Sequence, residues 1–223
     1  MISKLPRWIE VGGFGMAAIA GAINAIGLLG FQHQAISHVT GATSALSLSI
    51  VNADLTAAAH LLLTLLAFIL GAVISGTIVE NAVLRLGPRY SWALSVEAGL
   101  LLAAMLLLGQ GYVSGHYLAS AACGLQNGMV STYSGAIVRT THMTGLFTDL
   151  GTMLGSRLRG HPIDNRRMLI YLLLISGFVL GGIIGGIGFQ CWRFHSLLLP
   201  ILGSLGLSLW CWAYRRRQER MAA

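Results

Sequence analysis

The amino-acid sequence predicts an all-α integral membrane protein built from two inverted repeats of three spans each. Three observations lead to this prediction: the composition, the length of the apolar stretches and a set of motifs that occurs twice. Hydrophobic residues make up 55% of the chain and charged residues 9%. A soluble domain carries roughly a quarter charged residues, so a soluble fold is excluded.

Six apolar stretches are long enough to cross the bilayer as helices, which takes about 20 residues each. They are residues 11–30, 55–79, 91–109, 112–132, 168–190 and 195–214. The first stretch follows Lys4 and Arg7, as the apolar part of a signal peptide does. Because its repeat partner, residues 112–132, lies deep in the chain, we expect the first stretch to be retained.

The repeat is marked by the motif His-x-Thr-Gly, which occurs at residues 38–41 and again at residues 142–145. Flanking pieces recur in the same order. A Gly-x-x-Asn motif precedes each copy, at residues 21–24 and 124–127. A glycine-rich segment that begins with Phe follows each copy, at residues 68–76 and 178–186. Such collinear self-similarity predicts a duplicated membrane protein whose working site lies at the seam of the halves. The first repeat is residues 1–110 and the second is residues 111–223, together forming one membrane domain.

Two shorter segments, residues 39–53 and 143–156, each begin at the second residue of a His-x-Thr-Gly motif. As helices they reach only about 21 Å, and both are rich in Thr and Ser. Either both cross the bilayer, which gives eight spans, or both enter and return as half-helices, which leaves six spans.

The distribution of basic residues favours six spans. With a cytoplasmic N-terminus, six spans place thirteen Lys and Arg residues inside and only Arg193 outside, whereas eight spans divide them ten to four. Because basic residues collect on the cytoplasmic side, we expect six spans with both termini cytoplasmic and keep eight spans as the alternative. The net charge of +7 then reflects this rule, not nucleic-acid binding.

An odd number of spans per repeat places the two halves in opposite orientations, as in many channels and transporters. Residues 31–37 and 134–141 are then expected to descend to mid-membrane as extended chain. Thr40 and Thr144 are expected to cap the returning half-helices, whose N-termini face each other near the centre.

The motifs resemble those of the YoaK-like bacterial membrane proteins, a family defined by a domain of unknown function. The resemblance rests on Gly-x-x-Asn-Ala at residues 21–25, on the two Thr-Gly motifs and on Gly-Leu-Gln-Asn at residues 124–127. It implies a multi-span helical fold in the bacterial inner membrane and supplies no substrate or reaction. The family pattern has Asp at the position of Asn24 and Asn at that of Ala42.

The motif residues are the candidate substrate-binding site. Thr is a good N-cap residue and Gly lets another backbone approach closely, while helix N-termini attract anions. Histidines before each cap can line a passage, carry a proton or hold the chain by a hydrogen bond. Amides inside spans need partners, which we expect in the descending chain or the solute. The candidates are Thr40, Gly41, Thr144, Gly145, His38, His142, Asn24, Gln126 and Asn127.

Two acids, Asp149 and Glu97, fall inside apolar segments, where ionisable groups usually mark functional sites. We expect them to be the candidates for proton coupling. The structural alternatives are an ion pair of Asp149 with Arg139 and a hydrogen-bonded, protonated Glu97. Nothing in the sequence predicts a metal site, a cofactor or a disulfide; its cysteines are Cys123, Cys191 and Cys211.

The sequence therefore predicts a permease or channel for a small anion or a dipolar neutral solute, with its site between the Thr-Gly half-helices. The competing hypothesis is a membrane scaffold that transports nothing and whose seam is filled. An enzyme is not expected, because no spacing of nucleophile and base supports one. The expected partners are the lipid bilayer and a small solute, and a homo-oligomer is compatible with the sequence. The stripes Gly-x-x-x-Ser at residues 71–75 and Gly-x-x-x-Gly at residues 181–185 predict close helix contacts.

Overall fold

The computed structural model describes residues 8–30, 36–79, 88–134 and 139–222, and these residues form helices and turns without a strand. The helices are α1 (Trp8–Leu29), α2 (Val39–Val51), α3 (Leu55–Ile78), α4 (Pro88–Gly109), α5 (Ser114–Ser134), α6 (Met143–Leu158), α7 (Asn165–Trp192), the 3-10 helix η2 (Arg193–Leu197) and α8 (Leu198–Ala222). The predicted all-α class is confirmed.

Each of the six predicted spans coincides with a long helix: α1, α3, α4, α5, α7 and α8. By length and composition, α1, α3, α4 and the stretch of α7 and α8 over residues 165–217 are apolar enough to cross a membrane. The shorter segments are helices α2 and α6, which end at Val51 and Leu158, close to the expected ends at residues 53 and 156.

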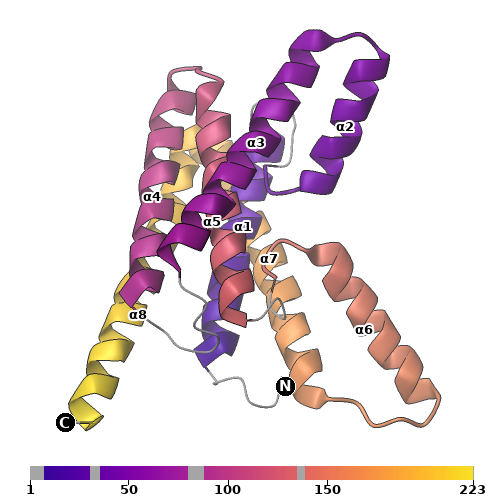
Figure 1. Cartoon of the computed structure of the whole chain (residues 1–223), viewed down its shortest axis with the longest axis vertical. Coiled ribbons are helices and arrows are strands. Elements are labelled where there is room, and N and C mark those ends of the chain that lie inside the picture. Colours follow the sequence, from indigo (N-terminus) through magenta and orange to yellow (C-terminus); the bar gives the residue numbers. More distant parts are fainter. Residues whose placement is uncertain (1–7, 31–35, 80–87, 135–138, 223) are drawn as a thin grey trace.

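The six long helices form a bundle in which the first helix of each half packs against the third helix of the other half (Figure 1). The principal pairs are α1 with α7 and α3 with α5, while α4 lies against α5 and α8. Because α1 and α3 come from the first half and α5 and α7 from the second, the two halves are intertwined.

Close backbone contact at equivalent positions holds both principal pairs together. A Cβ added to Gly21 on α1 would overlap the carbonyl of Phe178 on α7, and one added to Gly124 on α5 would overlap that of Phe68 on α3. Gly21 corresponds to Gly124 in the repeat, and Phe68 corresponds to Phe178. The same contact is therefore made twice.

The predicted small-residue stripes take part in the same interfaces. A Cβ on Gly71 would overlap the carbonyl of Ala121, and a Cβ on Gly181 would overlap that of Ala18. The expectation that these stripes are close helix contacts is confirmed, and they join α3 to α5 and α7 to α1. Helices that approach this closely gain van der Waals contact, which stabilises helix pairs where lipid removes the hydrophobic driving force.

The outward faces of α3 and α7 are apolar, as a bilayer requires. Their exposed side chains include Leu62, Leu66, Ile69, Leu70 and Val73 on α3, and Leu172, Val179, Leu180, Ile183 and Ile187 on α7. A contiguous apolar surface of this kind is foreign to a soluble monomer. The chain is therefore a membrane protein by the composition and exposure of its long helices.

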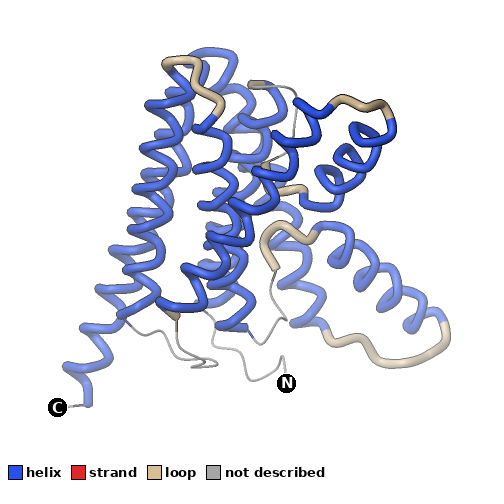
Figure 2. The backbone as a smooth tube through the Cα atoms, turned by 45° about the horizontal axis from the view of Figure 1, so that its top comes forward, coloured by secondary structure: helices blue, strands red, loops and turns tan. Residues whose placement is uncertain are grey.

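Helices α2 and α6 lie on one side of the bundle and extend from mid-height towards opposite ends (Figures 1 and 2). They have few neighbours: no residue of α2 is buried, and in α6 only Leu146 is. Several of their hydroxyl groups donate hydrogen bonds to carbonyls about one turn earlier in the same helix. The pairs are Thr43 to Val39, Ser44 to Thr40, Ser47 to Thr43, Thr148 to Thr144 and Thr152 to Asp149.

Candidate functional site

A cavity of about 480 Å³ lies where the two His-x-Thr-Gly motifs meet. Its lining comes from α1, α3, α5 and α7 and from the beginnings of α2 and α6. Twelve of the fourteen lining residues that the structure describes form six pairs related by the repeat: Asn24 and Asn127, Ser37 and Thr141, His38 and His142, Val39 and Met143, Thr40 and Thr144, and Phe68 and Phe178. Ser131 and Arg139 complete the lining from the second half. Equivalent residues of the two halves thus form most of the described lining of this one cavity.

Two asparagines fix the chain that leads into each motif. The side-chain oxygen of Asn24 on α1 accepts hydrogen bonds from the backbone N–H of Ser37, at 3.3 Å, and from its hydroxyl, at 3.1 Å. On α5, the side-chain oxygen of Asn127 accepts a hydrogen bond from the Thr141 hydroxyl at 2.6 Å. Ser37 and Thr141 each stand immediately before the motif histidine. The expected pairing of these amides with the chain that precedes the half-helices is confirmed.

The two asparagines differ in their second bond. Asn127 also donates its amide N–H to the carbonyl of Cys123, one turn earlier in α5, at 2.9 Å. For Asn24, the bonds within the described part of the chain use only its oxygen. Among the described residues, the side chain of Asn24 therefore acts only as an acceptor, whereas that of Asn127 acts as both an acceptor and a donor.

The prediction that Thr40 and Thr144 are N-caps was wrong. The N-cap residues are His38 and His142, whose backbone is non-helical, with ψ values of 71° and 60°. Their carbonyls already accept the first helical hydrogen bonds, from the N–H groups of Ala42 and Leu146. Each Thr is consequently the second residue of its helix, where it lines the cavity.

The motif glycines make room for their own histidines, and the predicted approach of a second backbone is not what they serve. A Cβ added to Gly41 would lie 2.9 Å from Nδ1 of His38, and one added to Gly145 would overlap the imidazole of His142. The ring of each histidine therefore folds over the first turn of its own helix. Each motif therefore consists of a histidine N-cap, two residues that line the cavity and a glycine that leaves room for the histidine ring.

Of the nine predicted binding residues, six line the cavity: Asn24, His38, Thr40, Asn127, His142 and Thr144. Gly41 and Gly145 each follow a lining threonine in the sequence and are not among the described lining residues. Gln126 is fully buried and points away to α1, where its amide donates to the carbonyl of Met16 at 3.1 Å. Gln126 therefore joins α5 to α1 and does not reach the cavity.

Asp149 on α6 is not among the described residues that line the cavity. Its carboxylate accepts a hydrogen bond from the Tyr171 hydroxyl at 2.7 Å and forms an ion pair with Arg167 at 3.4 Å. The alternative of an ion pair with Arg139 was wrong, because α6 rests on the start of α7 and brings Asp149 to that helix. With a side chain 46% exposed, the ion pair is worth at most about 1 kcal/mol.

Glu97 is fully buried in α4, close to Ser204 on α8 and Cys123 on α5, and it does not line the cavity. Neither carboxyl oxygen has a hydrogen-bond partner among the described residues. A carboxylate without partners in an apolar interior is very costly, so the neutral acid is the form that this site accommodates. Its role in proton coupling stays a prediction.

Sequence reasoning missed eight of the described lining residues: the pairs Phe68 and Phe178, Ser37 and Thr141, and Val39 and Met143, together with Ser131 and Arg139. The repeat carried a signal for the three pairs, since the members of each pair lie at equivalent positions in the two halves. For Ser131 and Arg139 there was none, because the equivalent positions of the first half hold the unlike residues Leu28 and Ala35 in the sequence.

The comparisons with known proteins give one match. No curated protein and no solved structure matches the chain. The model of one family, described as "Protein of unknown function (DUF1275)", matches residues 12–210 and thus both halves and every residue of the cavity. The chain belongs to the DUF1275 family.

Proposed function

We propose that this protein is a permease or channel for a small solute, either an anion or a dipolar neutral molecule, with its central site in the cavity between the two motifs. The observation that carries the proposal is the cavity itself. A scaffold protein does not require a space of about 480 Å³ lined by polar residues from both halves, whereas a permease requires such a space to hold its solute. Non-helical backbone at membrane depth is tolerated where it lines such a space.

The proposal includes an inverted arrangement of the halves. Two features support it: α2 and α6 start at the same cavity, and they extend from it in opposite directions (Figure 1). The intertwined pairs α1–α7 and α3–α5, which repeat the same glycine contacts, support it as well. In this arrangement α2 and α6 are half-helices that enter from opposite leaflets.

The function is tested by solute flux in liposomes that contain the purified protein. We expect flux above that of protein-free liposomes, and we expect it to be blocked when a bulky thiol reagent modifies Thr144→Cys in a Cys191→Ser background. Thr144 lines the cavity, while the other native cysteines, Cys123 and Cys211, are buried. Thr148→Cys is the matched control, because it lies one turn further along α6 and outside the lining.

If no solute crosses faster than in protein-free liposomes, the scaffold hypothesis is the better account. Equal loss of flux after modification at positions 144 and 148 would show that the reagent acts outside the cavity. Both results would overturn the proposed site.

Membrane topology is tested by thiol labelling from the periplasmic side of bacterial cells. Since α1 begins and α8 ends at the same end of the bundle (Figure 1), we place both termini in the cytoplasm. The variants Gly87→Cys and Gly160→Cys should then both resist labelling, while the exposed native Cys191 beside Arg193 reacts and serves as control. Labelling at position 87 but not at 160 would rule out six spans in favour of eight.

A further inference from the structure

We infer that the solute is a small monovalent anion with at least two oxygen acceptors, such as a carboxylate or a planar oxyanion, and that Arg139 selects its charge. This inference rests on the proposed function, because it concerns the same cavity. Arg139 was placed by sequence reasoning only in a loop or as a partner of Asp149. The structure assigns it to the lining instead.

The charges around the cavity carry the inference. Among the described lining residues, Arg139 is charged and no carboxylate accompanies it. Asp149, for which an ion pair with Arg139 was the structural alternative, is held by Arg167 and Tyr171. Within the described part of the chain Arg139 forms no ion pair. Arg139 is exposed to the space that it lines, and a positive charge in such a space raises the local concentration of anions.

The two helices that begin at the cavity add to this positive potential. Neither α2 nor α6 has a side-chain cap, so His38 and His142 leave the first N–H groups of the two helices without a side-chain acceptor. The N-terminal turn of a helix carries about half a positive charge. Thr40 and Thr144 belong to the same lining, and a Thr hydroxyl is able to donate a hydrogen bond.

The form of the ligand follows from the groups that face it. A guanidinium binds two oxygens of one group side by side, which matches a carboxylate or a planar oxyanion. A single arginine compensates one negative charge. The phenyl rings of Phe68 and Phe178 add apolar walls, which suit a small ion that sheds its water easily better than a multivalent ion that does not.

The test compares acetate with acetamide, which have nearly the same size but differ in charge, and adds nitrate as an inorganic oxyanion. Binding is measured as the concentration of each probe that gives half of the maximal rise in the unfolding temperature of the purified protein. We expect acetate, nitrate or both to bind, and acetamide to bind far more weakly. Binding of acetate alone assigns the carboxylate, and binding of nitrate alone assigns the inorganic oxyanion.

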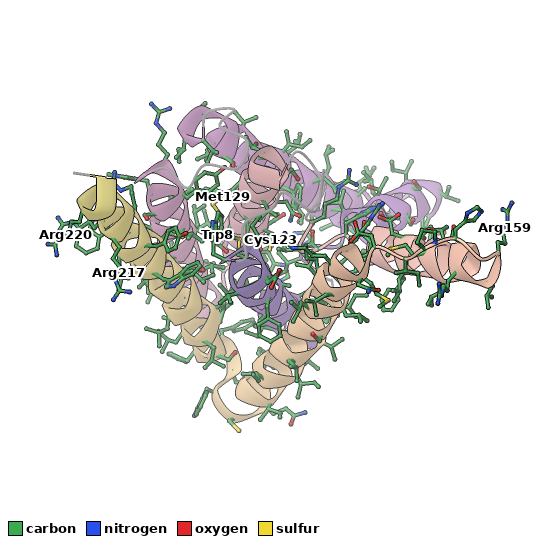
Figure 3. All side chains as sticks on the ribbon, turned by 90° about the horizontal axis from the view of Figure 1, so that it is seen from below. Trp8, Cys123, Met129, Arg159, Arg217 and Arg220 are labelled. Atoms are coloured by element: carbon green, nitrogen blue, oxygen red, sulfur yellow. The ribbon has the colours of Figure 1, made fainter. Side chains whose placement is uncertain are left out.

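The variants identify the residue responsible. Arg139→Gln should weaken anion binding by about 10- to 100-fold, as expected for the loss of a charge-assisted hydrogen bond, and should leave acetamide unaffected. Arg139→Lys keeps the charge and should retain part of the affinity. Arg159→Gln is the matched control, because Arg159 projects from the outer end of α6, away from the bundle (Figure 3).

Two outcomes overturn the inference and differ in what they say of the proposed function. If acetamide or another neutral solute binds or crosses the membrane while anions do not, or if Arg139→Gln and Arg159→Gln bind anions equally, the anion site is wrong and the permease stands. If neither charged nor neutral solutes bind or cross, the permease fails and the anion site fails with it.

Discussion

Replacing Gly71 with alanine should destabilise the protein strongly, although alanine is the better helix former. The added methyl group would overlap the carbonyl of Ala121, so α3 and α5 have to move apart along their whole contact. Overpacking of this kind costs typically 1–3 kcal/mol. This exceeds the gain of up to about 1 kcal/mol from replacing a glycine within a helix.

The matched control is Gly76→Ala, five residues further along α3, where an added Cβ meets nothing within 4 Å. The measurement is the unfolding temperature in detergent, or the denaturant concentration at half-unfolding. We expect Gly71→Ala to lower it and Gly76→Ala to leave it unchanged or raise it. Because the repeat places Gly181 against Ala18 in the same way, Gly181→Ala should repeat the loss. Equal stabilities of the Gly71 and Gly76 variants would refute the close contact of α3 and α5.

The second large effect is expected when the two cavity asparagines are changed to aspartate, and the two sites should respond differently. Among the described residues, Asn24 uses only its side-chain oxygen, which accepts from Ser37, so a carboxylate makes the same bonds. Asn127 also donates to the carbonyl of Cys123. An ionised carboxylate has no proton to donate, so Asn127→Asp removes this side-chain bond and places negative charge against a carbonyl that already accepts a backbone hydrogen bond of α5.

We expect Asn127→Asp to cost about 1 kcal/mol for the lost hydrogen bond, and the repulsion between the new carboxylate and the Cys123 carbonyl adds to this loss. Asn24→Asp should remain close to the unmodified protein. Urea or thermal unfolding of both variants in the same detergent decides this, with Asn127→Leu showing the loss of both bonds. A larger loss for Asn24→Asp than for Asn127→Asp would contradict the hydrogen-bond assignments at both sites.

The second site also ties stability to transport. Asn127 holds Thr141, which is followed at once by the cap residue His142 and the first turn of α6. Loosening this connection displaces the cavity wall even where the bundle survives. The flux assay should therefore detect Asn127→Asp at temperatures at which the protein is still folded.

The sequence by itself determined the segments and their duplication. All six long helices lie where apolar stretches of span length predicted them, and the two short helices begin inside their motifs. The small-residue stripes were correctly interpreted as helix contacts. These properties are local or collinear. The length of an apolar stretch sets whether a helix is able to span the bilayer, and a duplicated sequence preserves the order of its parts whatever they contact.

The tertiary structure alone decided which groups meet. It paired α1 with α7 and α3 with α5 across the halves, gave Asp149 to Arg167 and Tyr171, and turned Gln126 away from the cavity. It also placed Arg139 in the lining of the cavity. The physical reason is that spacing along a helix fixes the face on which a side chain stands, whereas its partner depends on how the helices cross. Here the crossing is set by close backbone contacts at a few glycines, and those contacts become visible only when the two halves are packed together.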